Sequence, residues 1–267
     1  MESYYSREET MRRQFVMELD AEGWEEAYPY TAGQLLKGQE APVIMQEQAR
    51  RLGTDNAEVV GTLFAKRYSV FAMGAAVCFT LYDDVLDLSH HRIGFRFSDS
   101  GALQYAAKTA EAVVGRDLEA SVRRRVFIAY WHQLDQHLRV LFQAVSACTG
   151  ANEKVMLSLV SHNLQQLYAS LAARKDSLPP EQAKRVLRDA TFLHEHQHGL
   201  TALRFRSYAH ARSKARPLLI RKHCCLAYRL VSEGESCAPA DAHDARYCLT
   251  CPKLDSEQRR KRLDDEL

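Results

Sequence analysis

The chain lacks a strong excess of charge of either sign. Its 267 residues carry 36 lysines and arginines against 34 aspartates and glutamates, which gives a formal net charge of +2. Proteins that bind nucleic acid over a whole surface are strongly basic, so this balance argues against that class. It leaves room for a local basic patch.

Long apolar runs are missing as well. The most apolar window, Val70–Tyr82, has 13 residues, whereas a helix that spans a membrane needs roughly 20. The first residues, MESYYSREETMRRQF, contain no apolar stretch of the kind found in secretory signals. We therefore expect a cytoplasmic protein without a transmembrane segment, whose 46% hydrophobic residues fill a buried core.

The apolar residues follow helical spacing over most of the chain. Helices are predicted from about Ala57 to Tyr82, from Leu118 to Thr149, over Met156–Leu171 and from Pro180 to Gly199. The segment His91–Phe97 alternates polar and apolar residues and precedes a turn, which predicts a small strand or hairpin. Short helices and loops are expected over residues 1–40. The predicted fold class is mainly α, with a small β-hairpin or strand element and a cysteine-rich C-terminal segment.

The seven cysteines are spread unevenly along the chain. Cys78 and Cys148 stand alone in apolar helical stretches, where a free cysteine usually behaves as a small hydrophobic residue. The other five lie in the last 44 residues, namely Cys224, Cys225, Cys237, Cys248 and Cys251. In a cytosolic chain such a cluster indicates metal binding or redox chemistry, and the odd total argues against a disulfide framework. We predict a helical domain over residues 1–216 and a cysteine-rich segment over residues 217–267 that packs on it.

Two short motifs compete with the cysteines for a functional interpretation. Asp83-Asp84-Val85-Leu86-Asp87 has the DDxxD pattern that holds Mg²⁺ against a diphosphate in isoprenoid synthases, but we find no second acidic motif. We expect a solvated corner between helix and strand here. His194-Glu195-His196-Gln197-His198 satisfies HExxH, the helical zinc motif of metalloproteases. Its third ligand is missing, so we expect a polar helix face.

The cysteines form two pairs, Cys224-Cys225 and Cys248-Leu249-Thr250-Cys251. Four thiolates in two pairs suit a tetrahedral zinc ion or the two irons of a [2Fe–2S] cluster. Spacing alone leaves these two centres, and a set of buried thiols without a metal, as alternatives.

A basic stretch leads into the first pair. Residues 201–232 contain eight lysines and arginines and no acid: Arg204, Arg206, Arg212, Lys214, Arg216, Arg221, Lys222 and Arg229. Those nearest the cysteines, Arg221, Lys222 and Arg229, are candidates to offset negative charge on a metal–thiolate centre and on a substrate. Arg204, Arg206, Arg212 and Arg216 are candidates for an approach surface, the alternative being a solvated basic face.

Two stretches, LIRKHCCLAYRL at 219–230 and YCLTCPKL at 247–254, resemble the C-terminal signature of the FhuF-like ferric siderophore reductases. That signature is an adjacent cysteine pair followed by a tyrosine and an arginine, then CxxCP and a charged tail. It falls here on Cys224, Cys225, Tyr228, Arg229, Cys248, Cys251 and Pro252. The helical body also resembles that family and the C-terminal part of IucA/IucC-type siderophore synthetases. The family's connection between the pairs is shorter than the 22 residues found here.

The resemblance implies a [2Fe–2S] cluster on Cys224, Cys225, Cys248 and Cys251, with Cys237 in the longer connection as a substitute or resolving thiol. It implies one-electron reduction of siderophore-bound Fe³⁺, which releases Fe²⁺. The partners would be a ferric siderophore, an electron donor of the ferredoxin or flavin type, and a siderophore transporter in peripheral contact. The alternatives are a zinc-stabilised module that binds a siderophore or a protein, and a synthetase-like enzyme that uses ATP. The last is weakened because we find no glycine-rich phosphate loop.

Overall fold

The computed structural model describes residues 5–110, 119–196, 198–209, 218–230 and 247–266. Within these ranges the protein is mainly helical, as predicted. The α-helices are α1 (Arg7–Phe15), α2 (Trp24–Ala27), α3 (Glu40–Leu52), α4 (Ala57–Tyr82), α5 (Ala120–Thr149), α6 (Glu153–Ala173), α7 (Pro180–Glu195) and α9 (Ser256–Glu266). Single 3₁₀ turns are η1 (Gln34–Leu36), η2 (His90–Arg92), η3 (Lys175–Ser177), η4 (Gly199–Thr201) and η6 (Ala227–Leu230). No described helix is long and apolar enough to cross a membrane.

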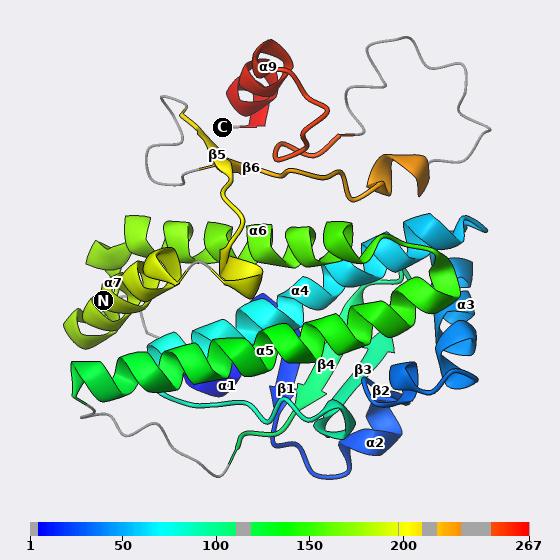
Figure 1. Ribbon diagram of the computed structural model, residues 1–267, viewed down its shortest axis with the longest axis horizontal. Coiled ribbons are helices and arrows are strands. Elements are labelled where there is room, and N and C mark those ends of the chain that lie inside the picture. The colour runs from blue at the N-terminus through cyan, green and yellow to red at the C-terminus, as the bar shows by residue number, and fades with distance from the viewer. Residues whose placement is uncertain (1–4, 111–118, 197, 210–217, 231–246, 267) are drawn as a thin grey trace.

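Helix α4 runs through the middle of the molecule (Figure 1) and has the bounds that its sequence predicted. The side chain of Asn56 accepts a hydrogen bond from the Val59 amide at 3.1 Å, which caps the first turn. Nearly every later position is buried, because α1, α3, α5, α6 and α7 all pack against this helix. Gly61 lets the end of α5 approach, since a β-carbon at this position would collide with Thr149.

A four-stranded sheet lies on one side of α4, in the order β1 (Met17–Leu19), β4 (Leu103–Ala107), β3 (Ile93–Phe97) and β2 (Tyr30–Thr31). Strands β3 and β4 form the antiparallel hairpin that the sequence predicted, with Phe95 opposite Tyr105. Strands β1 and β2 lie where only helices and loops were expected. They are short, and β1 pairs in parallel with β4, far along the chain.

The acidic run after α4 is not the solvated corner that we predicted. Asp83 is 2% exposed, accepts a hydrogen bond from the Arg123 guanidinium and forms an ion pair with Arg185 at 2.8 Å, while Arg123 also pairs with Asp189 at 2.8 Å. Asp84 pairs with Arg7. These two carboxylates tie the end of α4 to α5, α7 and α1, while the third, Asp87, accepts from the Ser89 amide at 2.9 Å.

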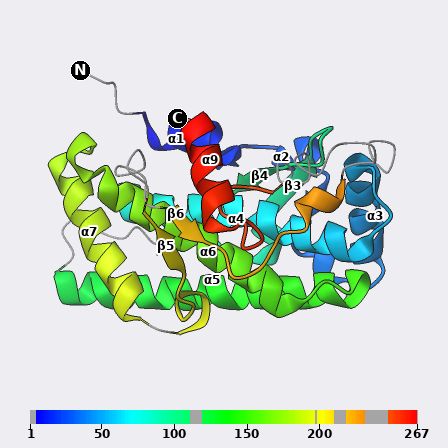
Figure 2. The same ribbon diagram turned by 90° about the horizontal axis from the view of Figure 1, so that it is seen from above.

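Two short antiparallel strands, β5 (Arg206–Tyr208) and β6 (Leu218–Ile220), begin the C-terminal part. Together with α9 they lie over α6, on the side away from the sheet (Figures 1 and 2). His162 on α6 donates its Nε2–H to the Leu219 carbonyl at 2.7 Å, and the Gln166 side chain accepts from the Leu219 amide at 2.7 Å. Strand β6 is thereby fixed on α6. The predicted domain boundary at 216/217 falls outside the described residues and stays a prediction.

Candidate metal centre

The two cysteine pairs come together although they are far apart in the sequence. Cys224 and Cys225 follow β6, and Cys248 and Cys251 precede α9. The Cys224 and Cys251 sulfurs are 3.7 Å apart. The amide of Arg221 donates to the Thr250 carbonyl at 3.0 Å, which joins the two segments through their backbones. Cys225 and Cys251 are buried, whereas Cys224 and Cys248 are half-buried.

Each pair has a distinctive local backbone geometry. In the second pair the Cys251 amide donates to the Cys248 carbonyl at 2.7 Å, which closes a tight turn of the CxxC type. After the first pair, Leu226 adopts a positive φ of 61° and its amide donates to the Cys224 sulfur at 3.4 Å. A left-handed conformation is rare for leucine and has to be held in place by its surroundings.

A buried arginine lies within the set of sulfurs. Arg221 is 5% exposed, and its Nη2 donates to the Cys248 sulfur. Its Nε has no hydrogen-bond partner, and no ion pair joins Arg221 to a carboxylate among the described residues. A buried cation without a counter-charge is costly, so this position favours negative charge on the neighbouring sulfurs.

A second arginine holds the CxxC turn from the other side. Arg259 on α9 is fully buried, and its guanidinium donates to the carbonyls of Leu249, Cys251 and Leu254 at 2.9, 2.7 and 3.0 Å. Arg262 donates to the carbonyl of Tyr247. The charged tail is therefore more than the solvated helix that its composition suggested, because α9 packs on the turn that carries Cys248 and Cys251. Nothing in the run RRKR indicates which arginine is buried.

The thiols of the metal-free chain differ in acidity. The hydrogen bond that joins the Cys224 and Cys251 sulfurs lowers the pKa of Cys251 to about 6, and the Lys253 amide and Arg221 act in the same direction. The hydrogen bond with Cys224, together with burial, raises the pKa of Cys225 to about 11. Of these two thiols, Cys251 therefore gives up its proton more readily than Cys225.

The donor set fits a metal centre in kind and number, but the described side chains are not arranged as a finished one. A tetrahedral metal with bonds to sulfur of about 2.3 Å places its thiolates about 3.8 Å apart. The Cys224 and Cys251 sulfurs match that spacing. Cys248 instead contacts Arg221, and no three His, Cys, Asp or Glu side chains gather as a metal site within the described ranges.

The remaining cysteines fall into two groups. Cys237 lies outside the described residues, so its predicted part as a spare ligand stays a prediction. Cys78 is fully buried within α4, where burial raises the pKa of its thiol. Cys148 sits near the end of α5, and burial raises its pKa as well. Both positions agree with cysteines that act as small hydrophobic residues.

The predicted basic residues take different places. Lys222 and Arg229 are exposed next to the first cysteine pair, as is His223. Arg204 donates to the carbonyls of Thr201 and His194 and so caps the end of α7. Arg206 lies exposed on β5. Arg212, Lys214 and Arg216 lie outside the described residues.

The HExxH residues do not form the helical turn that a zinc protease requires. Helix α7 ends at Glu195, short of the predicted end at Gly199, and His196 is its C-cap. Glu195 pairs with Arg124 at 3.0 Å. His194 and His198 are therefore not on successive turns of one helix.

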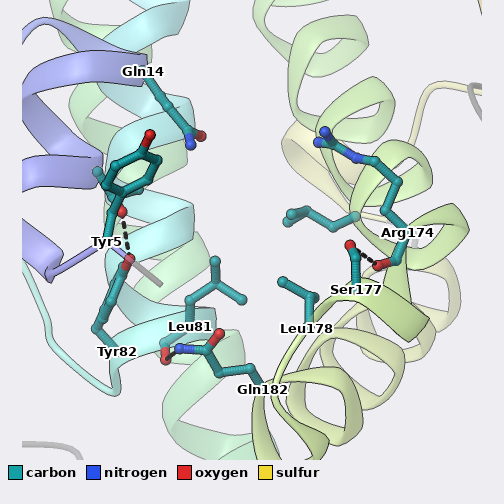
Figure 3. Close-up of a pocket in the computed structure, with 10 residues that line it drawn as sticks. Tyr5, Gln14, Leu81, Tyr82, Arg174, Ser177, Leu178 and Gln182 are labelled. Atoms are coloured by element: carbon teal, nitrogen blue, oxygen red, sulfur yellow. Dashed lines mark hydrogen bonds between the residues drawn. The ribbon is translucent and has the colours of Figure 1, made fainter. Parts of the chain in front are cut away.

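Two cavities of the described structure lie away from the cysteine segment. One, of about 460 Å³, lies between α1 and α4 on one side and the α6–α7 connection on the other; Tyr5, Gln14, Tyr82, Arg174 and Gln182 line it (Figure 3). Another, of about 480 Å³, is lined by the segment after α4 and by α5, with His90 and His137 at its wall. Neither adds a residue to the cysteine site.

No family model matches the chain, and no curated protein matches it.

Proposed function

We propose that the protein is a ferric siderophore reductase that carries a [2Fe–2S] cluster on Cys224, Cys225, Cys248 and Cys251. The observation that carries this proposal is the meeting of the two cysteine pairs around the buried guanidinium of Arg221. The resemblance to the C-terminal signature of the FhuF-like reductases supports it. Among the described residues, Cys224 of the first segment and Cys251 of the second lie 3.7 Å apart, and Cys225 and Cys248 are their neighbours in the chain.

Different residues of the site would bind such a centre, position its ligands and neutralise its charge. Cys225 and Cys251 are buried and would anchor it, whereas Cys224 and Cys248 lie nearer the surface. Arg259 on α9 holds the turn of the second pair by donating to backbone carbonyls of that turn. The sulfurs of Cys248 and Cys251 take no part in these hydrogen bonds. Arg221 offsets the charge of the thiolates from within.

When bound, a [2Fe–2S] cluster supplies a centre that takes up and gives away one electron at a time. The substrate is Fe³⁺ held by the hard oxygen donors of a siderophore. Transfer of one electron from the reduced protein converts it to Fe²⁺, which these donors hold less tightly, so the metal is released. A donor of the ferredoxin or flavin class returns the electron to the protein, and no acid–base pair is needed.

Metal analysis of the full chain, purified without oxygen, tests the cofactor. We expect about two irons and two acid-labile sulfides per chain, a red-brown colour and an EPR signal after reduction with dithionite. On addition of a ferric siderophore, the reduced spectrum should return to the oxidised one while a ferrous chelator captures Fe²⁺. A colourless protein that takes up only zinc would overturn the proposal.

Cysteine variants define the ligand set. Changing Cys224, Cys225, Cys248 or Cys251 to serine should remove the iron and the reductase activity together. Cys148→Ser is the matched control, because this half-buried thiol on α5 lies outside the site. Cys237→Ser should keep its iron. Loss of iron in Cys237→Ser but not in Cys248→Ser would show that the ligands are misassigned.

Zinc is the second candidate occupant, because the spacing of the Cys224 and Cys251 sulfurs also matches an edge of a zinc tetrahedron. The protein would then be a zinc-stabilised module that binds a siderophore or a protein partner. It would contain one zinc per chain, remain colourless and pass no electrons. The same metal analysis separates the two functions.

A further inference from the structure

Two tyrosines and two cations lie beside the cysteine site. The rings of Tyr228, on η6, and Tyr247, next to Cys248, have centroids 5.1 Å apart and planes inclined by 63°. The Lys253 ammonium is 4.9 Å from the Tyr228 centroid and 5.9 Å from the Tyr247 centroid. The Arg229 guanidinium is 6.0 Å from Tyr228. We call these four residues the tyrosine–cation platform.

The platform is open to solvent and positive. Arg229 and Lys253 are exposed, and both tyrosines are half-buried, so their rings are fixed while part of each surface is accessible. Glu58 lies 3.6 Å from Arg229 and offsets part of its charge. Asp255 uses its carboxylate to accept from the amides of Glu257 and Gln258 at the start of α9. Lys253 forms no ion pair with a carboxylate among the described residues.

The platform is also close to the sulfurs. Arg229 follows Cys225 by four residues and Lys253 follows Cys251 by two, so each cation belongs to a segment that carries cysteines. Tyr247 and Lys253 flank the Cys248–Cys251 turn in the sequence, and Tyr228 follows the first pair. A chelate resting on these rings would therefore lie against the exposed side of the proposed cluster.

Resting on the proposed function, we propose that the tyrosine–cation platform selects the substrate class: ferric chelates that are both aromatic and strongly anionic, of the tris-catecholate type. Such a complex is a trianion whose outer surface consists of aryl rings. Rings stack on tyrosine faces or edges, and the negative charge is met by Lys253 and Arg229. A neutral tris-hydroxamate offers neither aryl rings nor charge to this surface.

The tyrosine rings also hold the Lys253 ammonium in place before an anionic chelate binds. Because the Lys253 ammonium already lies over both tyrosines, it loses little side-chain freedom when an anion binds. Arg221 does not belong to this surface, since it is buried among the sulfurs. Of the basic residues that the sequence analysis selected, the platform includes only Arg229, and it adds Lys253 and the two tyrosines.

Gallium chelates test the preference without electron transfer, because Ga³⁺ has the charge and size of Fe³⁺ and is not reduced under these conditions. The as-purified full chain is titrated with gallium(III) tris-catecholate and with a neutral gallium(III) tris-hydroxamate, and tyrosine fluorescence or heat is followed. We expect the trianion to bind at least about tenfold tighter at low salt, with an advantage that shrinks as ionic strength rises. Equal affinities, or tighter binding of the neutral complex, would overturn the inference.

Variants place the preference on the platform. Lys253→Gln should weaken tris-catecholate binding about threefold to fivefold. The double variant Tyr228→Leu and Tyr247→Leu should weaken it further, and Tyr228→Phe should keep most of the affinity. Lys184→Gln, an exposed lysine on α7, is the control and should change nothing. Unchanged binding in both Lys253→Gln and the double variant would overturn the inference.

Iron and sulfide are measured on the same samples, which separates this inference from the proposed function. A preparation that contains the cluster but shows no preference overturns the substrate class alone. A preparation that prefers the trianion but holds no iron overturns the reductase and leaves the ligand class in place.

Discussion

In the helical body, α4 is surrounded by apolar side chains on nearly every side, whereas the cysteine segment buries few. In the described part of that segment, from residue 218 onward, the buried apolar residues are Ile220, Cys225, Cys251, Leu254 and Leu263. The segment is also held by two arginines: Arg259 donates to backbone carbonyls and Arg221 donates to the Cys248 sulfur. The body is stabilised mainly by the hydrophobic effect, and the segment by directed polar contacts to which a bound metal would add.

The comparison shows why the proposed metal centre belongs to the segment and not to the interior of the body. The core around α4 is made mostly of close-packed apolar side chains, which offer few donors to a metal and little access to a charged substrate. The segment lies on the surface of α6 with half-buried sulfurs and exposed cations. The body then serves as a rigid base, joined to β6 through His162 and Gln166.

The largest effect is expected from a substitution that lowers the stability of the helical body and leaves the cysteine segment unchanged. Arg123→Leu removes the 2.8 Å partner of buried Asp189, which keeps only Arg188 at 3.9 Å among its described arginine contacts, and weakens the hold on Asp83, so we expect a loss of about 3–5 kcal/mol in the free energy of unfolding. Urea unfolding followed by circular dichroism measures it. At temperatures where the variant is folded, its iron content should be that of the unchanged protein.

A neighbouring arginine provides the control. Arg124 pairs with Glu195 at 3.0 Å, and both side chains are about half exposed. Arg124→Leu should therefore cost no more than about 1 kcal/mol. Equal losses in the two variants would mean that burial of the Arg123 network does not govern the stability of the body.

The sequence predicted the parts of the body whose causes are local. Asn56 and the apolar run behind it fix the bounds of α4, and alternation fixes the β3–β4 hairpin. Strand β1 was missed because a strand of three residues owes its existence to pairing with β4, which no local pattern records. Asp83 was taken for a solvated residue because its partners, Arg123 and Arg185, come from helices far along the chain.

The site was predictable to a different degree. The spacing of the cysteines, with the family resemblance, indicated that the two pairs belong together, and the structure brings Cys224 next to Cys251. The arginines could not be assigned from the pattern. Arg221 and Arg259 are buried by the way β6 and α9 dock, and in the sequence they look like their exposed neighbours. The ring contacts of Lys253 depend on two segments and were missed for the same reason.

A smaller effect is expected from loosening the segment alone. Arg259→Ala removes the donors for the Leu249, Cys251 and Leu254 carbonyls, which should cost about 1–3 kcal/mol locally. We expect faster amide exchange over residues 247–255 and roughly tenfold weaker binding of Cd²⁺ by the reduced, metal-free chain, read from its thiolate absorption band. The unfolding of the body should not change.

Arg260→Ala tests whether position on α9, rather than charge, matters. Arg260 is exposed on the same helix, so its removal lowers the net charge equally and breaks none of these bonds. If Arg260→Ala weakened Cd²⁺ binding as much as Arg259→Ala, the effect would be one of overall charge, and the assignment of Arg259 to the CxxC turn would be wrong.

The smallest expected difference between the body and the segment is in how their stability responds to a lower pH. Burial lowers the pKa of His137 in the body to about 3, and its ring contacts the Tyr68 hydroxyl and the Leu88 carbonyl, both at 2.9 Å. The unfolded chain takes up a proton at this residue near pH 6.5, and the folded chain does not until far lower pH. The unfolded state therefore binds more protons, and stability falls as pH drops below about 6.5, by about 1 kcal/mol per unit from this residue.

Urea unfolding between pH 7 and 5.5 should show that slope, and His137→Gln should reduce it. His162 donates its Nε2–H to Leu219 in both of its charge states, so the contact between the body and β6 should persist over this range. A slope that is the same in His137→Gln would mean that other groups, and not this buried imidazole, set the acid sensitivity of the body.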